Sequence, residues 1–376
     1  MKISLIGPTY PYRGGISHHT TLLFENLSKK HDVLFITFKR QYPKILYPGK
    51  TDIDPSKFAF KPRGALSILD SINPLTWIKT AIKIIYSKPD LVIFPWWVAF
   101  WTPQFYTIST IVKKFTSAKI LFICHNVVEH ESSLLKKFMT RLVLKKGDFF
   151  IVHSKDDQNN LNYVVNNPNV KLCFLPNFDI LKIDHLPSKE DAKHELGLDN
   201  KDTILFFGFI RPYKGLLPLI QIMPKLIEQK PDLRLLIVGE FWKDKDLYYN
   251  LINTLNIQRF LRVYDGYIPN EQVPKYFCAS DFVVLPYKSA TGSAIVQMAY
   301  NFNKPVVATK VGSLSDVVMD GVTGYLVDKD NPEQLIQAIL KMFENRKFME
   351  FEKNIPEIEK NFSWDTMINS IESFFK

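Results

Sequence analysis

Long hydrophobic runs are missing from this sequence of 376 residues. No stretch reaches the roughly 18 consecutive apolar residues that a membrane-spanning helix needs. The opening residues MKISLIGPTY lead directly into a strand-like run, without the long apolar segment and small-residue cleavage site of a secretory signal peptide. These absences argue against a membrane-spanning or secreted protein, and we expect a cytoplasmic location.

Cysteine is scarce, and the three residues lie far apart, at Cys124, Cys173 and Cys278. Their spacing fits neither a metal site nor a redox pair, and buried packing is their expected role. His125 and His130, with Glu129 and Glu131 beside them, offer an alternative metal site. That spacing spans a strand end and a loop, where ligand geometry is not fixed. We therefore expect no metal and no other cofactor.

Acidic residues are few in the first half of the chain. Residues 1–180 carry 24 Lys+Arg and 12 Asp+Glu, whereas the remainder carries 24 and 26. A basic half favours an anionic partner, either lipid headgroups or nucleic acid, although a solvated basic surface has the same composition. No nucleic-acid-binding motif is present, so we expect an anionic membrane surface rather than a nucleic acid as partner.

Short apolar runs alternate with amphipathic stretches along the whole chain. The first series of runs covers residues 3–7, 33–38, 90–96, 119–125 and 148–154, and the second covers 203–210, 233–240, 262–268, 281–287, 305–309 and 324–328. Buried parallel strands have this continuous apolar character, and helices between them indicate doubly wound sheets. The fold class is therefore α/β, with two consecutive Rossmann-like domains facing across a cleft.

The join between the two series lies near residues 175–189, where Pro176 and Pro187 interrupt the pattern. We expect one domain over residues 1–180 and a second domain over residues 181–360. A last helix over residues 361–376 begins at the cap-like Ser363 and is expected to pack back on the first domain.

Residues suited to ligand binding follow the predicted strands, where ligands bind in open α/β sheets. Gly14 and Gly15 separate the first strand from a helix, so backbone amides can approach an anion there, although a simple tight turn is an equal alternative. The spacing is neither GxGxxG nor a Walker loop. His125 ends the fourth strand, where an imidazole can donate to a sugar hydroxyl or a phosphate.

The most informative loop is GFIRPYKG, residues 208–215. Arg211 and Lys214 follow a strand and precede a helix that begins near Gly215, an arrangement that predicts a diphosphate clamp. Fixed cations stabilise the charge that develops on a leaving nucleoside diphosphate. A further strand ends before the turn Thr291, Gly292 and Ser293, whose amides could bind the phosphates from another side.

Four segments in order resemble the large fourth family of retaining glycosyltransferases, which includes glycogen synthase and phosphatidylinositol mannosyltransferase and has the two-Rossmann GT-B fold. They are GFIRPYKG, GYIPNEQVPKYFCASDFVVLPY, KPVVATKVGSLSDVV and DGVTGYLVD. In the first half the resemblance rests only on the Gly-Gly loop and the His-Asn pair after the fourth strand.

The resemblance implies roles for individual positions. It assigns the donor diphosphate to Arg211 and Lys214, the transferred sugar to His125, and the phosphates and acceptor to the loop at Gly15. The base-binding edge corresponds to Gly266, Tyr267 and Ile268.

One departure from the family pattern concerns two glutamates, eight positions apart, that hold the ribose and contact the sugar. Their positions are occupied here by Ala290 and Met298. Gln297 is the nearest polar substitute, turned by about 100° on the helix.

The resemblance implies a retaining hexosyltransferase that moves a sugar from a nucleotide-sugar donor to a glycan or lipid-linked acceptor in cell-envelope polysaccharide or glycolipid synthesis. No glycosidase-type carboxylate pair stands in the expected positions. The resemblance implies front-face attack, in which the leaving phosphate helps to take the acceptor proton. Two alternatives remain open: a nucleotide-sugar epimerase of the same architecture, and a degenerate, non-catalytic nucleotide-binding protein.

Two segments bear on the acceptor. The stretch 133–146, SLLKKFMTRLVLKK, predicts a basic amphipathic helix of the kind that lies on anionic membranes, or alternatively a helix packed on the core. The aromatic run WWVAFWTPQFY, residues 96–106, could grip a lipid or sugar or be buried as core.

Overall fold

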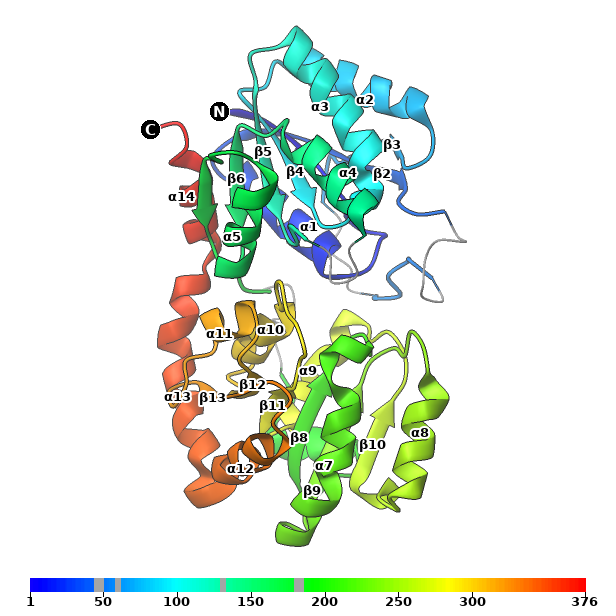
Figure 1. The fold of residues 1–376 in the computed structure, drawn as a ribbon, viewed down its shortest axis with the longest axis vertical. Helices are drawn as coiled ribbons and strands as arrows, with labels where there is room; N and C mark the ends of the chain where they lie inside the picture. The colour runs from blue at the N-terminus through cyan, green and yellow to red at the C-terminus, as the bar shows by residue number, and fades with distance from the viewer. Residues whose placement is uncertain (44–50, 58–61, 129–132, 179–185) are drawn as a thin grey trace. The chain divides into compact units, whose positions relative to one another are not determined.

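The computed structural model describes residues 1–43, 51–57, 62–128, 133–178 and 186–376. The chain forms two compact units, shown in Figure 1. The first unit comprises Met1–Pro55, Ala59–Pro176 and Ser363–Lys376, and the second comprises Ser56–Phe58 and Asn177–Phe362. Each unit is a parallel sheet with helices on both faces, which confirms the predicted α/β class.

The sheet of the first unit has seven parallel strands in the order β3-β2-β1-β4-β5-β6-β7. They are β1 (Lys2–Ile6), β2 (Asp32–Arg40), β3 (Leu66–Asp70), β4 (Leu91–Trp96), β5 (Lys119–Cys124), β6 (Phe149–Val152) and β7 (Val170–Leu172). The central strand β4 is buried at every position, as a strand covered by helices on both faces must be.

Helices connect these strands and cover the sheet. They are α1 (Gly15–Ser28), α2 (Pro74–Ser87), α3 (Thr102–Phe115), α4 (Leu134–Leu144) and α5 (Lys155–Val164). The aromatic run lies between β4 and α3, and Trp96, Trp97, Trp101 and Phe105 are all buried in the core of this unit. The idea that these four rings grip a lipid or a sugar is therefore wrong, because they pack against one another and the sheet.

The sheet of the second unit has six parallel strands in the order β10-β9-β8-β11-β12-β13. They are β8 (Asp202–Phe207), β9 (Leu233–Val238), β10 (Leu261–Tyr264), β11 (Phe282–Leu285), β12 (Val306–Thr309) and β13 (Gly324–Val327). The order changes direction between β8 and β11, and loops after such neighbouring strands form the usual ligand site of this fold.

The helices of the second unit are α6 (Lys189–Glu195), α7 (Leu216–Gln229), α8 (Lys245–Thr254), α9 (Val273–Ala279), α10 (Ala294–Asn301), α11 (Ser313–Val317), α12 (Pro332–Phe343) and α13 (Lys347–Glu359). Helix α10 begins at Ala294, because Ser293 still has an extended backbone. Residues Thr291, Gly292 and Ser293 therefore precede this helix, where the sequence predicts a turn.

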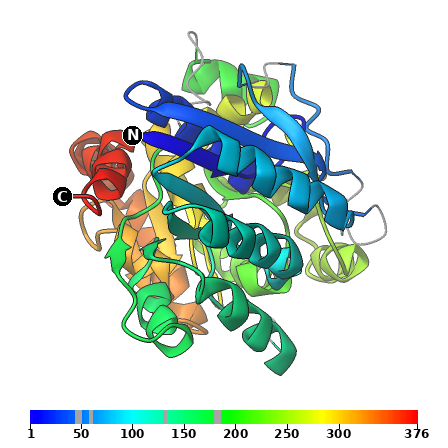
Figure 2. The ribbon, with the colours of Figure 1, turned by 90° about the horizontal axis from the view of Figure 1, so that it is seen from above.

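The last helix, α14 (Trp364–Glu372), belongs to the first unit, as predicted (Figure 2). The Ser363 hydroxyl caps its start by accepting from the Thr366 amide at 3.2 Å. The Glu372 Oε1 atom lies 3.0 Å from the Nε2 atom of His31, which follows the end of α1. The chain thus returns to its starting unit after completing the second one. Among the residues that the structure describes, no helix is both long and apolar enough to cross a bilayer.

Candidate donor-binding site

The loop after β8 carries the predicted diphosphate clamp. Arg211 precedes a 3-10 turn over Pro212–Lys214, and α7 begins two residues after Lys214. Both cations therefore stand between the carboxyl end of a strand and the N-terminus of a 14-residue helix. That N-terminus adds unsatisfied amides and a partial positive charge, which favour an anionic ligand.

Glycines give this loop its shape. Gly215 has a φ of +73°, and a Cβ there would lie 1.8 Å from the Pro286 carbonyl oxygen, so a larger residue would displace the loop after β11. A Cβ on Gly208, where φ is +102°, would lie 3.2 Å from the Lys214 Nζ atom. The Lys214 ammonium group therefore lies against the bare backbone at the end of β8.

The Arg211 guanidinium is oriented by aromatic rings. Its central carbon lies 4.6 Å from the centre of the Trp242 ring and 5.5 Å from that of Tyr213. Cation–π stacking restrains the planar group and leaves its N–H edge available for an oxygen ligand. A planar fork is suited to two oxygens of one phosphate.

Burial and the nearby Arg211 charge lower the pKa of Lys214 from 10.5 to about 8. Burial is the larger cause, because it destabilises the charged form of an ammonium group relative to the neutral amine. At neutral pH the group still carries its proton. A bound diphosphate would raise the pKa of Lys214 again, because its negative charge stabilises the protonated amine against both burial and the Arg211 charge.

The turn Thr291, Gly292 and Ser293 follows β11, which pairs with β8 in the sheet. Its residues thus lie at the same edge of the sheet as the clamp. The backbone amide of Lys288 donates to the Tyr213 carbonyl oxygen at 2.7 Å, which joins the loop after β11 directly to the clamp loop.

Gln297 lies on α10, and only 1% of its surface is exposed. In the described part of the chain its buried Oε1 atom has no hydrogen-bond partner. Buried amide oxygens are normally satisfied, so this atom is a candidate for contact with a ligand or a water. Its role in donor binding stays a prediction.

The predicted base-binding segment Gly266, Tyr267 and Ile268 follows β10, two strands from β8. The Tyr267 ring lies 6.5 Å from the ring of Phe209, which belongs to the clamp loop. The structure therefore brings this segment to the same edge of the second sheet as Arg211 and Lys214.

The remaining predicted residues belong to the first unit. Gly14 has a φ of +108° and immediately precedes α1, and a Cβ on Gly14 or on Gly15 would meet no atom within 4 Å. His125 follows β5, but its ring is only 7% exposed and lies beside His19 and His153. The possible metal partners Glu129, His130 and Glu131 lie outside the described residues.

Sequence reasoning missed His19 and His153. Both had a visible signal, because His153 ends an apolar run just as His125 does, and His19 stands one turn into the helix after the Gly-Gly loop. The neighbourhood of His125 and His153 could be predicted only with the strand order, which places β5 beside β6.

Comparison with known proteins identifies this arrangement. Residues 188–361 match the family described as "Glycosyl transferases group 1". This part of the chain, most of the second unit, is similar to that family. The match covers β8 to β13, and it includes the clamp, the Thr291–Ser293 turn and the predicted base-binding segment.

The similar proteins differ in how much of this chain they match. The D-inositol 3-phosphate glycosyltransferase of Corynebacterium efficiens is 28% identical over 193 residues, which are 50% of this chain and 45% of that protein. An uncharacterized glycosyltransferase of Methanocaldococcus jannaschii is 24% identical over 100% of this chain and 98% of its own length. The chain thus spans about half the length of some curated relatives and nearly all of others.

A solved structure extends the likeness to the whole fold of the chain. Anabaena HepE, determined with UDP and glucose, superposes with a TM-score of 0.77 at 17% identity, covering 100% of this chain and 99% of that one. This likeness shows that the chain has the GT-B fold.

The two glutamates expected from the resemblance to this family are absent from the sequence. Ala290 lies in the loop after β11, where its carbonyl oxygen packs against Gly312, and Met298 is a half-buried residue of α10. Gln297, one position earlier, is turned inward instead. Any donor contact on this helix must therefore come from an amide or the backbone rather than a carboxylate.

Proposed function

We propose that this chain is a retaining glycosyltransferase that moves a sugar from a nucleotide-diphosphate donor to a glycan or lipid-linked acceptor. The observation that carries the proposal is the pair Arg211 and Lys214, held at the end of β8 by glycines and aromatic rings. The family match over residues 188–361 and the likeness in fold to Anabaena HepE, solved with UDP-glucose, support it.

The proposed chemistry follows from charge. Breaking the glycosidic bond leaves negative charge on the nucleoside diphosphate, and fixed cations stabilise the transition state more than the ground state. The Lys214 ammonium is partly desolvated, so its interaction with the leaving oxygens is stronger than it would be in water. In this proposal the leaving phosphate takes the acceptor proton, and the protein contributes positioning and charge.

A nucleotide screen tests donor binding. Melting temperatures are measured with UDP, GDP, ADP and CDP, because a ligand that binds only the folded state raises the melting temperature. One base should stand out in the wild-type chain, and Arg211→Ala should lose that shift. Lys225→Ala is the matched control, because Lys225 is an exposed cation of α7 that pairs with exposed Glu333. No shift with any nucleotide would contradict donor binding.

The missing glutamates favour one alternative, a family member that binds a nucleotide without turnover. The two functions separate when the selected nucleotide sugar is incubated with the chain and an acceptor lipid extract. Release of nucleoside diphosphate with a new glycoconjugate supports transfer, whereas binding without release supports the alternative. An isomerised nucleotide sugar in the absence of acceptor would indicate an epimerase.

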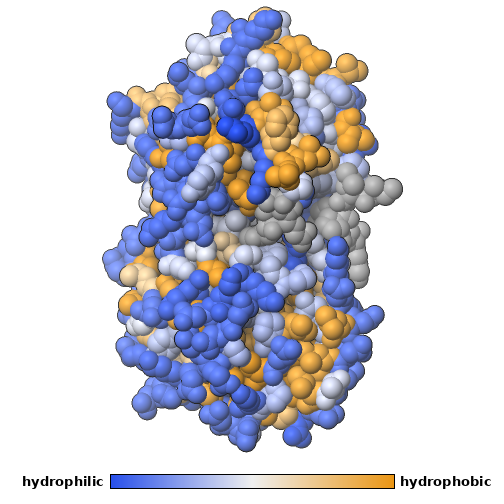
Figure 3. Space-filling view, in the orientation of Figure 1, coloured by the Kyte–Doolittle hydropathy of each residue, from blue (hydrophilic) through white to orange (hydrophobic). Residues whose placement is uncertain are grey.

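We also propose that the acceptor lies at an anionic membrane surface, which α4 contacts. Leu134, Leu135 and Phe138 on this helix are 85%, 66% and 63% exposed, so the apolar residues at its start do not pack on the core. The buried residues of α4 lie in its second half and are Thr140, Val143 and Leu144. Figure 3 shows hydrophobic surface over α4. Exposed apolar residues in this number indicate an interaction surface.

Basic residues surround this apolar surface. A groove of about 470 Å³ between α4 and α5 is lined by Phe138 and Tyr163 together with Lys136, Lys137 and Arg141. Apolar side chains flanked by cations suit a lipid, whose chains are apolar and whose anionic headgroup is attracted by the cations. The acceptor would then be presented to the first unit at the cytoplasmic face of the membrane.

A further inference from the structure

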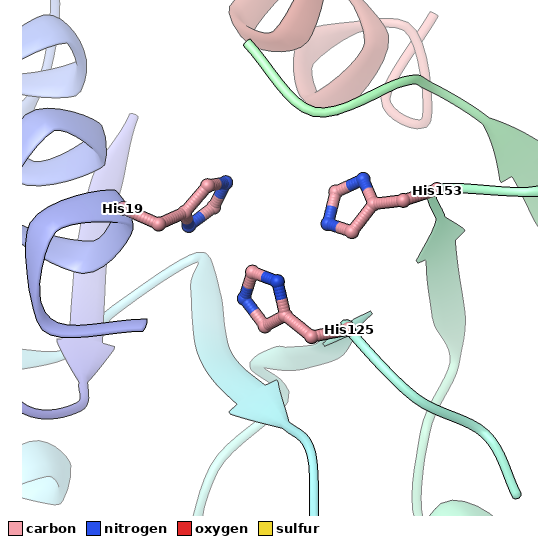
Figure 4. Close-up of side chains that lie close together, drawn as sticks. All are labelled: His19, His125 and His153. Atoms are coloured by element: carbon pink, nitrogen blue, oxygen red, sulfur yellow. The ribbon is translucent and has the colours of Figure 1, made fainter. Parts of the chain in front are cut away.

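Three buried imidazole rings meet inside the first unit, each from a different element. His19 lies on α1, His125 directly follows β5, and His153 directly follows β6. Figure 4 shows the three side chains directed toward one another around a shared space. All three histidines belong to the first unit, whereas the clamp loop and the predicted base segment belong to the second.

The fold requires two of these side chains to be neighbours. Strands β5 and β6 are parallel, and Cys124 pairs with Val152 at their ends. The next residue on each strand is therefore a histidine at the same edge of the sheet. The first full turn of α1 adds His19 above them, and the ring centres lie 4.6 Å (His19–His125), 4.9 Å (His125–His153) and 5.7 Å (His19–His153) apart.

The cluster offers one ring nitrogen from each histidine, and these three atoms all lie within 4.8 Å of one another. Zinc–nitrogen bonds of about 2.0 Å in a tetrahedral site place ligand nitrogens about 3.3 Å apart. Small rotations of the side chains would therefore close the site around an ion. The residues are 2%, 7% and 1% exposed in sequence order, so an ion there would be shielded from water.

Polar atoms in the cluster are left without partners. Both ring nitrogens of His19 and the Nε2 atoms of His125 and His153 are buried and accept or donate no hydrogen bond within the described residues. Buried polar groups are normally satisfied, so four such atoms around one space indicate a missing ligand. Either an ion or ordered water would satisfy them, and the two are separated by the test below.

The protonation states suit a metal. Burial lowers the pKa of all three rings below 6.5, and that of His153 falls to about 4, so lone pairs are available at neutral pH. The His153 Nδ1 atom lies 2.7 Å from the Cys173 carbonyl oxygen and must donate its proton to it. This contact leaves the Nε2 lone pair facing the cluster, as second-sphere hydrogen bonds do in metal sites.

We propose that His19, His125 and His153 bind one divalent transition ion, with Zn²⁺ as the best match. Three neutral imidazoles suit zinc, whereas Mg²⁺ and Ca²⁺ prefer oxygen ligands. A water molecule takes the fourth position of the tetrahedron. The ion binds the neutral rings and displaces no proton from them.

Such an ion would fix the start of α1 to the ends of β5 and β6. The Trp364 ring of α14 lies 5.3 Å from the His19 ring, so the last helix also packs on the cluster. The ion would hold the Gly14–Gly15 loop, four to five residues before His19, in a constant position. Its role is structural, and His125 would then serve as a ligand whatever its contact with a sugar.

Metal content tests the proposal on the full chain without an affinity tag, since a polyhistidine tag binds the same ions. The purified chain is treated with a chelator, supplied with Zn²⁺ and desalted, and zinc is measured by mass spectrometry. The expected result is one zinc per wild-type chain. His19→Gln and His153→Gln should each lower this to near zero, and His194→Gln, at an exposed histidine, should not.

The X-ray absorption spectrum of the zinc-loaded wild-type chain provides a readout that does not depend on variants folding. It should show three imidazole nitrogens at about 2.0 Å. Absence of bound zinc in the folded wild-type chain would overturn the proposal, as would a full zinc equivalent in folded His153→Gln. Either result would mean that ordered water, and not an ion, occupies the space among the three rings.

Discussion

Several neighbouring residues determine the position and the pKa of the Lys214 ammonium group. The group lies against Gly208, its loop ends at Gly215, and its pKa is lowered by burial and by Arg211. Arg211, Lys214 and both glycines stand in the segment GFIRPYKG, so their place between a strand and a helix could be predicted from sequence, whereas their role as a diphosphate clamp stays a prediction. The aromatic support from Trp242 could not be predicted, because that residue follows a different strand.

The lowered pKa of Lys214 predicts pH-dependent donor binding. The free side chain is protonated at pH 7 and loses its proton as the pH rises through about 8. Nucleoside diphosphate binding favours the protonated form, so the Kd should rise on the order of tenfold between pH 7 and pH 9.5. Calorimetric titration at several pH values measures this change.

Lys214→Arg is the matched control for the pH experiment. A guanidinium keeps its charge throughout this range, so the variant should show a nearly flat profile even if its affinity is lower. A steep profile in the variant would assign the titration to another group and contradict the role of Lys214.

Gly215→Ala tests the backbone of the clamp loop. The alanine would require a positive φ and would bring a Cβ to 1.8 Å from the Pro286 carbonyl oxygen. We expect a loss of about 2–3 kcal/mol in the free energy of unfolding, measured by urea denaturation. Gly197→Ala is the control, because its φ is +63° but a Cβ there meets nothing within 4 Å. Its expected cost is about 1 kcal/mol, and equal losses would refute the steric argument.

At the scale of elements, hydrophobic periodicity predicted the strands well. It did not predict whether an amphipathic helix packs on the core or is exposed. The stretch 133–146 had the pattern of either a core helix or a membrane-surface helix. The structure separates its two halves: Leu134 and Phe138 are exposed, whereas Val143 and Leu144 are buried. Sequence alone could not resolve this difference, because it depends on which part of α4 packs against its neighbours α3 and α5.

Vesicle binding tests α4. Wild-type protein should sediment with vesicles that contain anionic lipid and not with neutral vesicles, and high salt should release it. Leu135→Ser combined with Phe138→Ser should weaken this binding about tenfold or more, because each exposed side chain contributes roughly 1.5–3 kcal/mol when buried in lipid. Leu75→Ser, at a 74% exposed position on α2, is the control. Equal binding to both vesicle types would contradict the membrane role.

At the scale of the whole molecule, α14 determines whether the first unit is complete. Its buried face consists of Trp364, Met367, Ile368 and Ile371. Burial of four such side chains contributes roughly 6–12 kcal/mol, comparable to the entire stability of a domain. The return of this helix to the first unit was predicted from its late, capped, amphipathic pattern and the family resemblance.

Truncation tests this dependence. A chain that ends at residue 362 should lose the protected amides of β1 to β7 in hydrogen exchange, because the first unit can no longer bury its surface beside α1. Removal of only Phe375 and Lys376, of which Phe375 is 41% exposed, should leave the exchange pattern unchanged. Full protection in the longer truncation would show that α14 is dispensable.

Recognition of two phosphates together by Arg211 and Lys214 is the central claim, and comparing nucleotides that differ by one phosphate tests it most directly. By calorimetry, the wild-type chain should bind the selected nucleoside diphosphate at least tenfold more tightly than its monophosphate. The Arg211→Ala and Lys214→Ala double variant should lose this preference while Lys225→Ala retains it. Equal affinity of the wild-type chain for both nucleotides, or an unchanged preference in the double variant, would contradict the account.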